Sequence, residues 1–119
     1  MGFTYIKILV CNPMATEKKK EVEVLVDTGA VFSVIPRDIL EEVGIKPTAM
    51  REFKIFGGRK VERETGGALF QYDSVRAEVP VTFGEKEDKP ILGVTALESL
   101  GYNVDPVTKK LKKVDLLML

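Results

Sequence analysis

The sequence predicts a mainly β fold with one or two short helices in a single domain, and three observations support this. The chain has 119 residues, a length that suits one domain with one buried core. Short runs rich in β-branched and aromatic residues recur along it, separated by glycine, proline and charged clusters. Two segments instead carry helix signals, at about 37–43 and 95–100. We therefore expect residues 1–119 to form one β-rich domain.

The first third of the chain predicts two strands and a helix. Residues 5–10 consist largely of β-forming residues. Residues 21–26 alternate between acidic and apolar side chains and then become wholly apolar, which predicts a strand that begins half exposed and ends buried. A short helix is expected at 37–43, because the proline before it suits a first turn and a glycine follows it.

A hairpin is the clearest prediction for the middle of the chain. Two strand-like runs, 53–56 and 59–64, are joined by Gly57-Gly58, and tight hairpin turns favour residues that tolerate positive φ. A second glycine pair, Gly66-Gly67, is expected to break the chain again. Further strands are expected between residues 69 and 83.

The last third predicts a short apolar strand at 90–93, a helix at 95–100 and a final strand at 112–119. Thr95 and Glu98 have the spacing of a capping box, in which the hydroxyl satisfies a first-turn N–H and the carboxylate reaches back. The apolar end of the chain is either a strand of the core or part of an interface with a second subunit.

The composition excludes several kinds of active site. The chain contains no histidine and one cysteine, so it cannot build a Ser-His-Asp triad or a Cys-His dyad. The common Cys/His zinc sites are excluded for the same reason, and we expect no metal and no cofactor. A general acid or base must therefore be a carboxylate, lysine, tyrosine or cysteine.

The charge balance and the absence of sorting signals also constrain the partners. Lys and Arg number 18, as do Asp and Glu, which argues against nucleic-acid binding. No apolar run is long enough to span a membrane, and the first residues lack the pattern of a signal peptide. Cys11 has no partner for an intrachain disulfide, which suits a reducing compartment, and we expect a cytoplasmic protein.

The strongest local motif lies where an apolar strand ends, in Leu25-Val26-Asp27-Thr28-Gly29-Ala30. A carboxylate placed there costs several kcal/mol unless it is paired or hydrogen-bonded. Thr28 can donate a hydrogen bond, and Gly29 permits a tight turn with closely spaced N–H groups. The motif alone is equally compatible with an ordinary turn at the end of a strand.

In its wider context this motif resembles the retropepsin-like aspartic proteases. Asp27-Thr28-Gly29-Ala30 is followed by Ser33-Val34-Ile35-Pro36, then by a two-glycine hairpin, and then by Ile91-Leu92-Gly93 before a helix. The order of elements matches that family from about residue 6 to residue 114. The resemblance implies the acid-protease β-barrel characteristic of retropepsins.

The resemblance also assigns roles to residues. It implies that Asp27 is catalytic, that Thr28, Gly29 and Ala30 complete the active-site turn with Thr28 linking two such turns, and that a hairpin covers the substrate. The hairpin tip, with its expected substrate contacts, and the strand that supports the active site are identified in the same way: Phe56, Gly57, Gly58; Ile91, Leu92, Gly93.

These roles imply an aspartic endopeptidase that hydrolyses peptide bonds only as a homodimer. Such enzymes use two carboxylates that share one proton, because like charges so close together cannot both ionise. The sequence contains one Asp-Thr-Gly, so a symmetric dimer would have to bring two copies of Asp27 together. The expected partners are a second copy of the chain and a peptide or protein substrate.

Two alternatives remain open at this level: an inactive peptide-binding or dimerisation module on the same fold, and a small β domain in which Asp-Thr-Gly is accidental. The hairpin is also rather basic, with Lys54, Arg59, Lys60 and Arg63. These cations either form a solvated strand face or favour acidic peptides.

Overall fold

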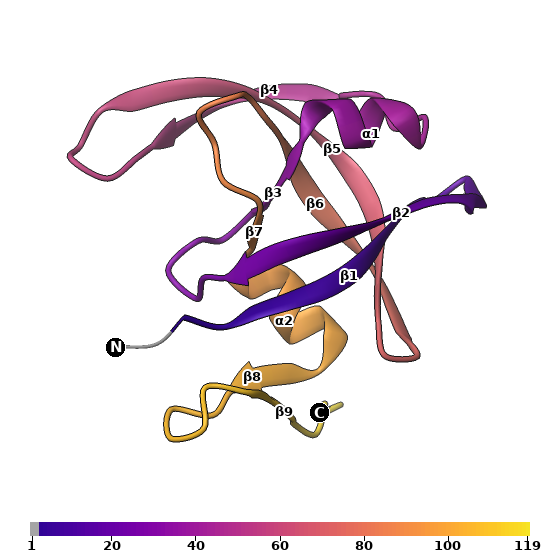
Figure 1. Cartoon of the computed structure of the whole chain (residues 1–119), viewed down its shortest axis with the longest axis vertical. Helices are drawn as coiled ribbons and strands as arrows, with labels where there is room; N and C mark the ends of the chain where they lie inside the picture. The colour runs from indigo at the N-terminus through magenta and orange to yellow at the C-terminus, as the bar shows by residue number, and fades with distance from the viewer. Residues whose placement is uncertain (1–2) are drawn as a thin grey trace.

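A computed structural model describes residues 3–119, which form nine strands and two short helices (Figure 1). The elements, in chain order, are β1 (Tyr5–Asn12), β2 (Ala15–Val26), β3 (Ser33–Pro36), α1 (Arg37–Glu42), β4 (Ala49–Lys54), β5 (Lys60–Tyr72), β6 (Val75–Gly84), β7 (Ile91–Leu92), α2 (Val94–Leu100), β8 (Tyr102–Val104) and β9 (Leu111–Lys113). The mainly β fold with two short helices that the sequence predicts is confirmed.

Seven strands form one sheet in the order β1-β2-β7-β3-β6-β5-β4. Strand β1 pairs with β5 as well as with β2, so the strand pairings close into a ring and leave β4 outside it. Strand β4 pairs with the first part of β5, and this hairpin extends beyond the rest of the molecule at the upper left of Figure 1. The closed pairing leaves few free strand edges.

The core lies inside this ring and follows from alternating side chains. In β2, Val22 and Val24 are buried while the glutamates beside them are exposed. Helix α2 adds Ala96, Leu97 and Leu100 to the same cluster. Burial of this apolar surface stabilises the fold and holds the loops at the sheet's end in place.

The second glycine pair does not interrupt the chain, contrary to the sequence prediction. Strand β5 runs through Gly66 and Gly67, and both residues are paired with β6. A Cβ at Gly66 would lie 3.0 Å from the carbonyl oxygen of Lys46. At Gly66 the glycine therefore allows close approach of two backbone segments and does not mark a turn.

The predicted capping box is wrong. Helix α2 begins at Val94, its N-cap is Gly93, and no side chain caps it. The first amides of the helix already have partners, because Val94 N–H donates to Ala30 O (2.7 Å) and Thr95 N–H donates to Val31 O (3.3 Å). These tertiary contacts replace the local cap that the sequence pattern predicts.

The predicted final strand is much shorter than expected. Strand β9 ends at Lys113 and pairs with β8 in a separate two-stranded sheet. Residues 114–119 form no strand, and their apolar side chains are 36–116% exposed, so the tail is not a strand of the core. Within residues 3–119, no helix has the length and apolar character needed to cross a membrane.

Candidate active site

The Asp-Thr-Gly turn directly follows β2 and is held by backbone hydrogen bonds. Asp27 N–H donates to Leu92 O (3.0 Å), and Ala30 N–H donates to Asp27 O (3.2 Å). Gly29 N–H donates to Asp27 Oδ1 at 2.9 Å, so the turn orients the carboxylate. Asp27 is half-buried, whereas Thr28 is exposed and its hydroxyl makes no hydrogen bond within the part of the chain that the structure describes.

The predicted support strand lies directly beneath this turn. Strand β7 pairs in parallel with the end of β2 and contacts β3 on its other side, which places Ile91 and Leu92 between the two. Gly93 N–H donates to the buried Ser33 Oγ at 2.9 Å. Backbone packs tightly here, since a Cβ at Gly93 would lie 2.7 Å from the carbonyl carbon and oxygen of Phe32.

A cleft of about 670 Å³ separates the turn from the β4–β5 hairpin. Asp27, Gly29 and Ala30 line it on the side of the turn. The hairpin, β3, β6 and the loop before β7 supply most of the other lining residues: Val34, Phe53, Lys54, Ile55, Phe56, Val61, Arg63, Thr82, Asp88, Lys89 and Ile91. The cleft is mostly apolar with few charged groups, as expected of a ligand site.

The hairpin tip has the predicted turn. Gly57 and Gly58 have φ of 95° and 85°, a region that favours glycine, and the turn is closed by Ile55 N–H donating to Arg59 O (2.8 Å). Phe56 borders the cleft, and its side chain is fully exposed to solvent. Gly57 and Gly58 are not among the residues that line the cleft. The Phe32 and Phe53 rings meet edge to face at 5.8 Å and join the hairpin to the segment that follows the Asp-Thr-Gly turn.

Comparison with protein families identifies the chain. A family model described as "gag-polyprotein putative aspartyl protease" matches residues 15–99, which include the Asp-Thr-Gly turn, the hairpin and β7. The chain belongs to this family of aspartic proteases. A comparison with curated proteins finds no match.

Solved structures share the retropepsin-like fold. The EIAV protease complexed with the inhibitor HBY-793 is 17% identical with a TM-score of 0.59, over 98% of this chain and 94% of that one. A retropepsin-like aspartic protease from Rickettsia conorii is 20% identical with a TM-score of 0.56, over 87% of this chain and 77% of that one. At these identities the likeness concerns the fold.

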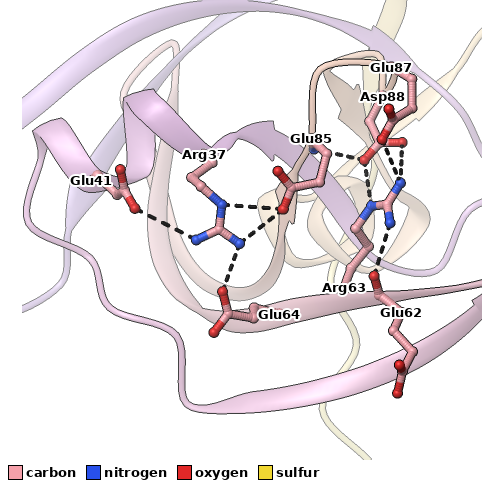
Figure 2. Close-up of polar contacts among 8 residues, drawn as sticks. All are labelled: Arg37, Glu41, Glu62, Arg63, Glu64, Glu85, Glu87 and Asp88. Atoms are coloured by element: carbon pink, nitrogen blue, oxygen red, sulfur yellow. Dashed lines mark hydrogen bonds and ion pairs between the residues drawn. The ribbon is translucent and has the colours of Figure 1, made fainter.

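Two arginines, Arg37 and Arg63, hold the loop before β7 (residues 85–90) against β5 through ion pairs (Figure 2). We call these two arginines and their carboxylate partners the clasp. Arg63 donates to both carboxylate oxygens of Asp88, at 2.7 and 3.1 Å, and Arg37 bridges Glu64 (2.7 Å) and Glu85 (3.0 Å). Hydrogen bonds from Arg63, and after them one from the Glu85 amide, hold the pKa of Asp88 below its ordinary value. The clasp therefore fixes one wall of the cleft.

We expect Asp88→Asn to destabilise the fold by about 2 kcal/mol at neutral pH, because it weakens a charge-assisted, partly buried pair. Since the folded-state pKa is depressed, the stabilisation is present above the unfolded pKa of about 4 and is lost as pH falls through the folded pKa. Urea unfolding of wild type and variant at neutral and strongly acidic pH checks this.

Asp73 is exposed and lies in the turn that joins β5 to β6, so it supplies a matched control. Asp73→Asn removes a carboxylate without breaking an ion pair and is expected to change stability by less than about 0.5 kcal/mol. If Asp88→Asn behaved like Asp73→Asn at neutral pH, the clasp would contribute nothing to stability.

Sequence reasoning missed several cleft residues. Thr82 lies in β6, whereas Asp88 and Lys89 lie in the loop before β7, and no local motif signals that they share a cleft with Asp27. Within residues 3–119, no group of three or more acidic or cysteine side chains is arranged to hold a metal ion.

Proposed function

We propose that the protein is an aspartic endopeptidase that forms its dyad from two copies of Asp27 across a homodimer. The observation that carries this is the placement of Asp27, oriented by its own turn, on a cleft roofed by the β4–β5 hairpin. A peptide would lie in this cleft, with the hairpin acting as a flap over it.

The proposed mechanism uses carboxylates and water alone. The ionised Asp27 accepts a proton from a water molecule as that water attacks the scissile carbonyl, while the protonated Asp27 of the second copy donates to the carbonyl oxygen. Two carboxylates this close share one proton because both cannot ionise, as is established for aspartic proteases as a class. No nucleophile from the protein is required.

A single chain does not supply the second carboxylate. Two carboxylates line the cleft, and Asp88 is hydrogen-bonded to Arg63, which lowers the pKa of Asp88 and so disfavours a proton shared with Asp27. The other aspartates lie outside the cleft, and none is followed by Thr-Gly or Ser-Gly: Asp38, Asp73, Asp105 and Asp115. A second copy is the simplest source of the missing group.

The two ends of the described chain form the best candidate for the dimer interface. Thr4 Oγ1 donates to Lys109 O at 2.6 Å, so the start of the chain lies against the loop between β8 and β9. Large apolar side chains are exposed at both ends: Phe3, Tyr5, Val114, Leu116, Leu117, Met118 and Leu119. A second copy that covers them would remove an apolar patch from water.

The oligomeric state and the activity are tested together. We expect specific activity to rise with protein concentration and to follow the dimer fraction measured by analytical ultracentrifugation. Removal of residues 116–119 should shift both curves to higher concentration in parallel. A monomer with full activity would overturn the dimer proposal, and a dimer that binds peptides without cleaving them would favour the binding module.

A further inference from the structure

The charges that line the cleft are unbalanced. Five charged side chains border it, of which Arg63 and Asp88 neutralise each other through two hydrogen bonds. Lys54 and Lys89 remain, and neither has a carboxylate within salt-bridge distance among residues 3–119. They border a cleft in which Asp27 is the one carboxylate without an ion-pair partner among residues 3–119.

The basic residues of the hairpin are not equivalent. Lys60 pairs with Glu52 at 3.7 Å and does not line the cleft, and Arg59 does not line it either. Arg51 stacks over the Phe32 ring at 5.3 Å. Lys54 is therefore the hairpin cation that both borders the cleft and lacks an ion-pair partner among residues 3–119, and the structure adds Lys89 from the loop before β7.

The clasp determines where Lys89 lies. Asp88 is fixed by Arg63, and Leu25 N–H donates to Pro90 O at 3.1 Å, so the residues on both sides of Lys89 are anchored. A cation on an anchored backbone loses less entropy when it binds an anion than one on a mobile loop. Lys89 also stands two residues before Ile91, which lines the apolar part of the cleft.

We propose that this cleft selects peptides that carry an acidic residue beside an apolar segment, with Lys54 and Lys89 as the specificity-determining residues. The inference rests on the proposed endopeptidase function. Apolar side chains would bind against the apolar wall of Val31, Phe32, Val34, Ile55 and Ile91. In a dimer with one shared proton, four lysines would face one negative charge of the dyad, so a peptide carboxylate would meet a net positive field.

The test uses matched peptides that differ by one charge. A single glutamate is moved through the positions that flank an apolar core, and each peptide is compared with its glutamine counterpart. We expect the wild-type protein to cleave the best glutamate peptide about five- to tenfold more efficiently than its counterpart, in kcat/KM. That ratio should fall toward one as salt rises from about 0.05 to about 0.5 M.

Variants assign the effect to the two lysines. The double variant Lys54→Gln with Lys89→Gln should bring the glutamate-to-glutamine ratio close to one, with each single variant between. Lys86→Gln is the matched control, because Lys86 lies on the same loop, is exposed and does not line the cleft. It should keep the wild-type ratio. A wild-type ratio of one, or a ratio that the double variant leaves unchanged, would overturn the proposal.

A binding measurement separates this proposal from the enzymatic one. Fluorescence anisotropy of labelled glutamate and glutamine peptides is measured on Asp27→Asn, with and without the two lysine changes. Tighter binding of the glutamate peptide that depends on Lys54 and Lys89 supports the specificity even if wild type cleaves nothing. Cleavage with equal binding of both peptides retains the enzyme and rejects the acidic preference.

Discussion

Asp27→Asn is expected to lower kcat for peptide cleavage at least about a thousandfold while leaving the fold intact. An amide cannot share a proton with a second carboxylate or accept one from water, so neither half of the dyad would work. Asn Oδ1 can still accept the hydrogen bond that Gly29 N–H donates to Asp27 Oδ1. We therefore expect the stability to change by less than about 1 kcal/mol.

Cleavage of a denatured protein at mildly acidic pH, together with thermal unfolding, provides the measurement. Asp38→Asn is the control, because the Asp38 carboxylate also accepts a hydrogen bond from a neighbouring backbone N–H, that of Ile39 at 3.0 Å. It lies outside the cleft and should retain full activity. An active Asp27→Asn protein would reject the proposed mechanism.

Mixing experiments test whether both copies of Asp27 are needed. With a tenfold excess of Asp27→Asn over wild type and full exchange of subunits, about a tenth of the wild-type activity should remain, because most wild-type chains then sit in mixed dimers. If mixed dimers retained half of the activity, one Asp27 would be sufficient and the shared dyad would be excluded.

Gly93→Ala is expected to destabilise the fold by about 3 kcal/mol or more and to abolish cleavage. The added Cβ would lie 2.7 Å from two backbone atoms of Phe32 and 2.8 Å from Val31 O. The backbone of Gly93, with φ −82° and ψ 172°, is accessible to alanine, so the cost is steric. Relief of the clash would displace residues 31–32, which follow the Asp-Thr-Gly turn and line the cleft.

Gly67→Ala is the control for this change. Gly67 lies within β5, where a Cβ would meet nothing within 4 Å, and its φ is not positive. We expect a change within about 1 kcal/mol and normal cleavage. Urea midpoints and cleavage rates of both variants decide the matter. Equal losses in the two would show that close packing around Gly93 does not support the active-site turn.

Elements with strong local signals were predictable. The alternation in β2, the glycine turn at residues 57–58 and helix α1 all depend on neighbours in the sequence, and the structure has each of them. Two of the predictions that failed concern segments with distant partners. The start of α2 is hydrogen-bonded to residues 30–31, and the strand through Gly66-Gly67 is held by β6, which no local pattern reveals.

The residue types alone limit the chemistry that is open to this protein. Without histidine the chain has carboxylate chemistry available, and with one Asp-Thr-Gly it can contribute one carboxylate to the proposed dyad. The fold determines which charges share the cleft with Asp27: Asp88 pairs with Arg63, whereas Lys54 and Lys89 have no ion-pair partner within residues 3–119. Strand pairing brings these residues together from segments that are far apart in the chain. The charge balance of the cleft therefore depends on the tertiary structure.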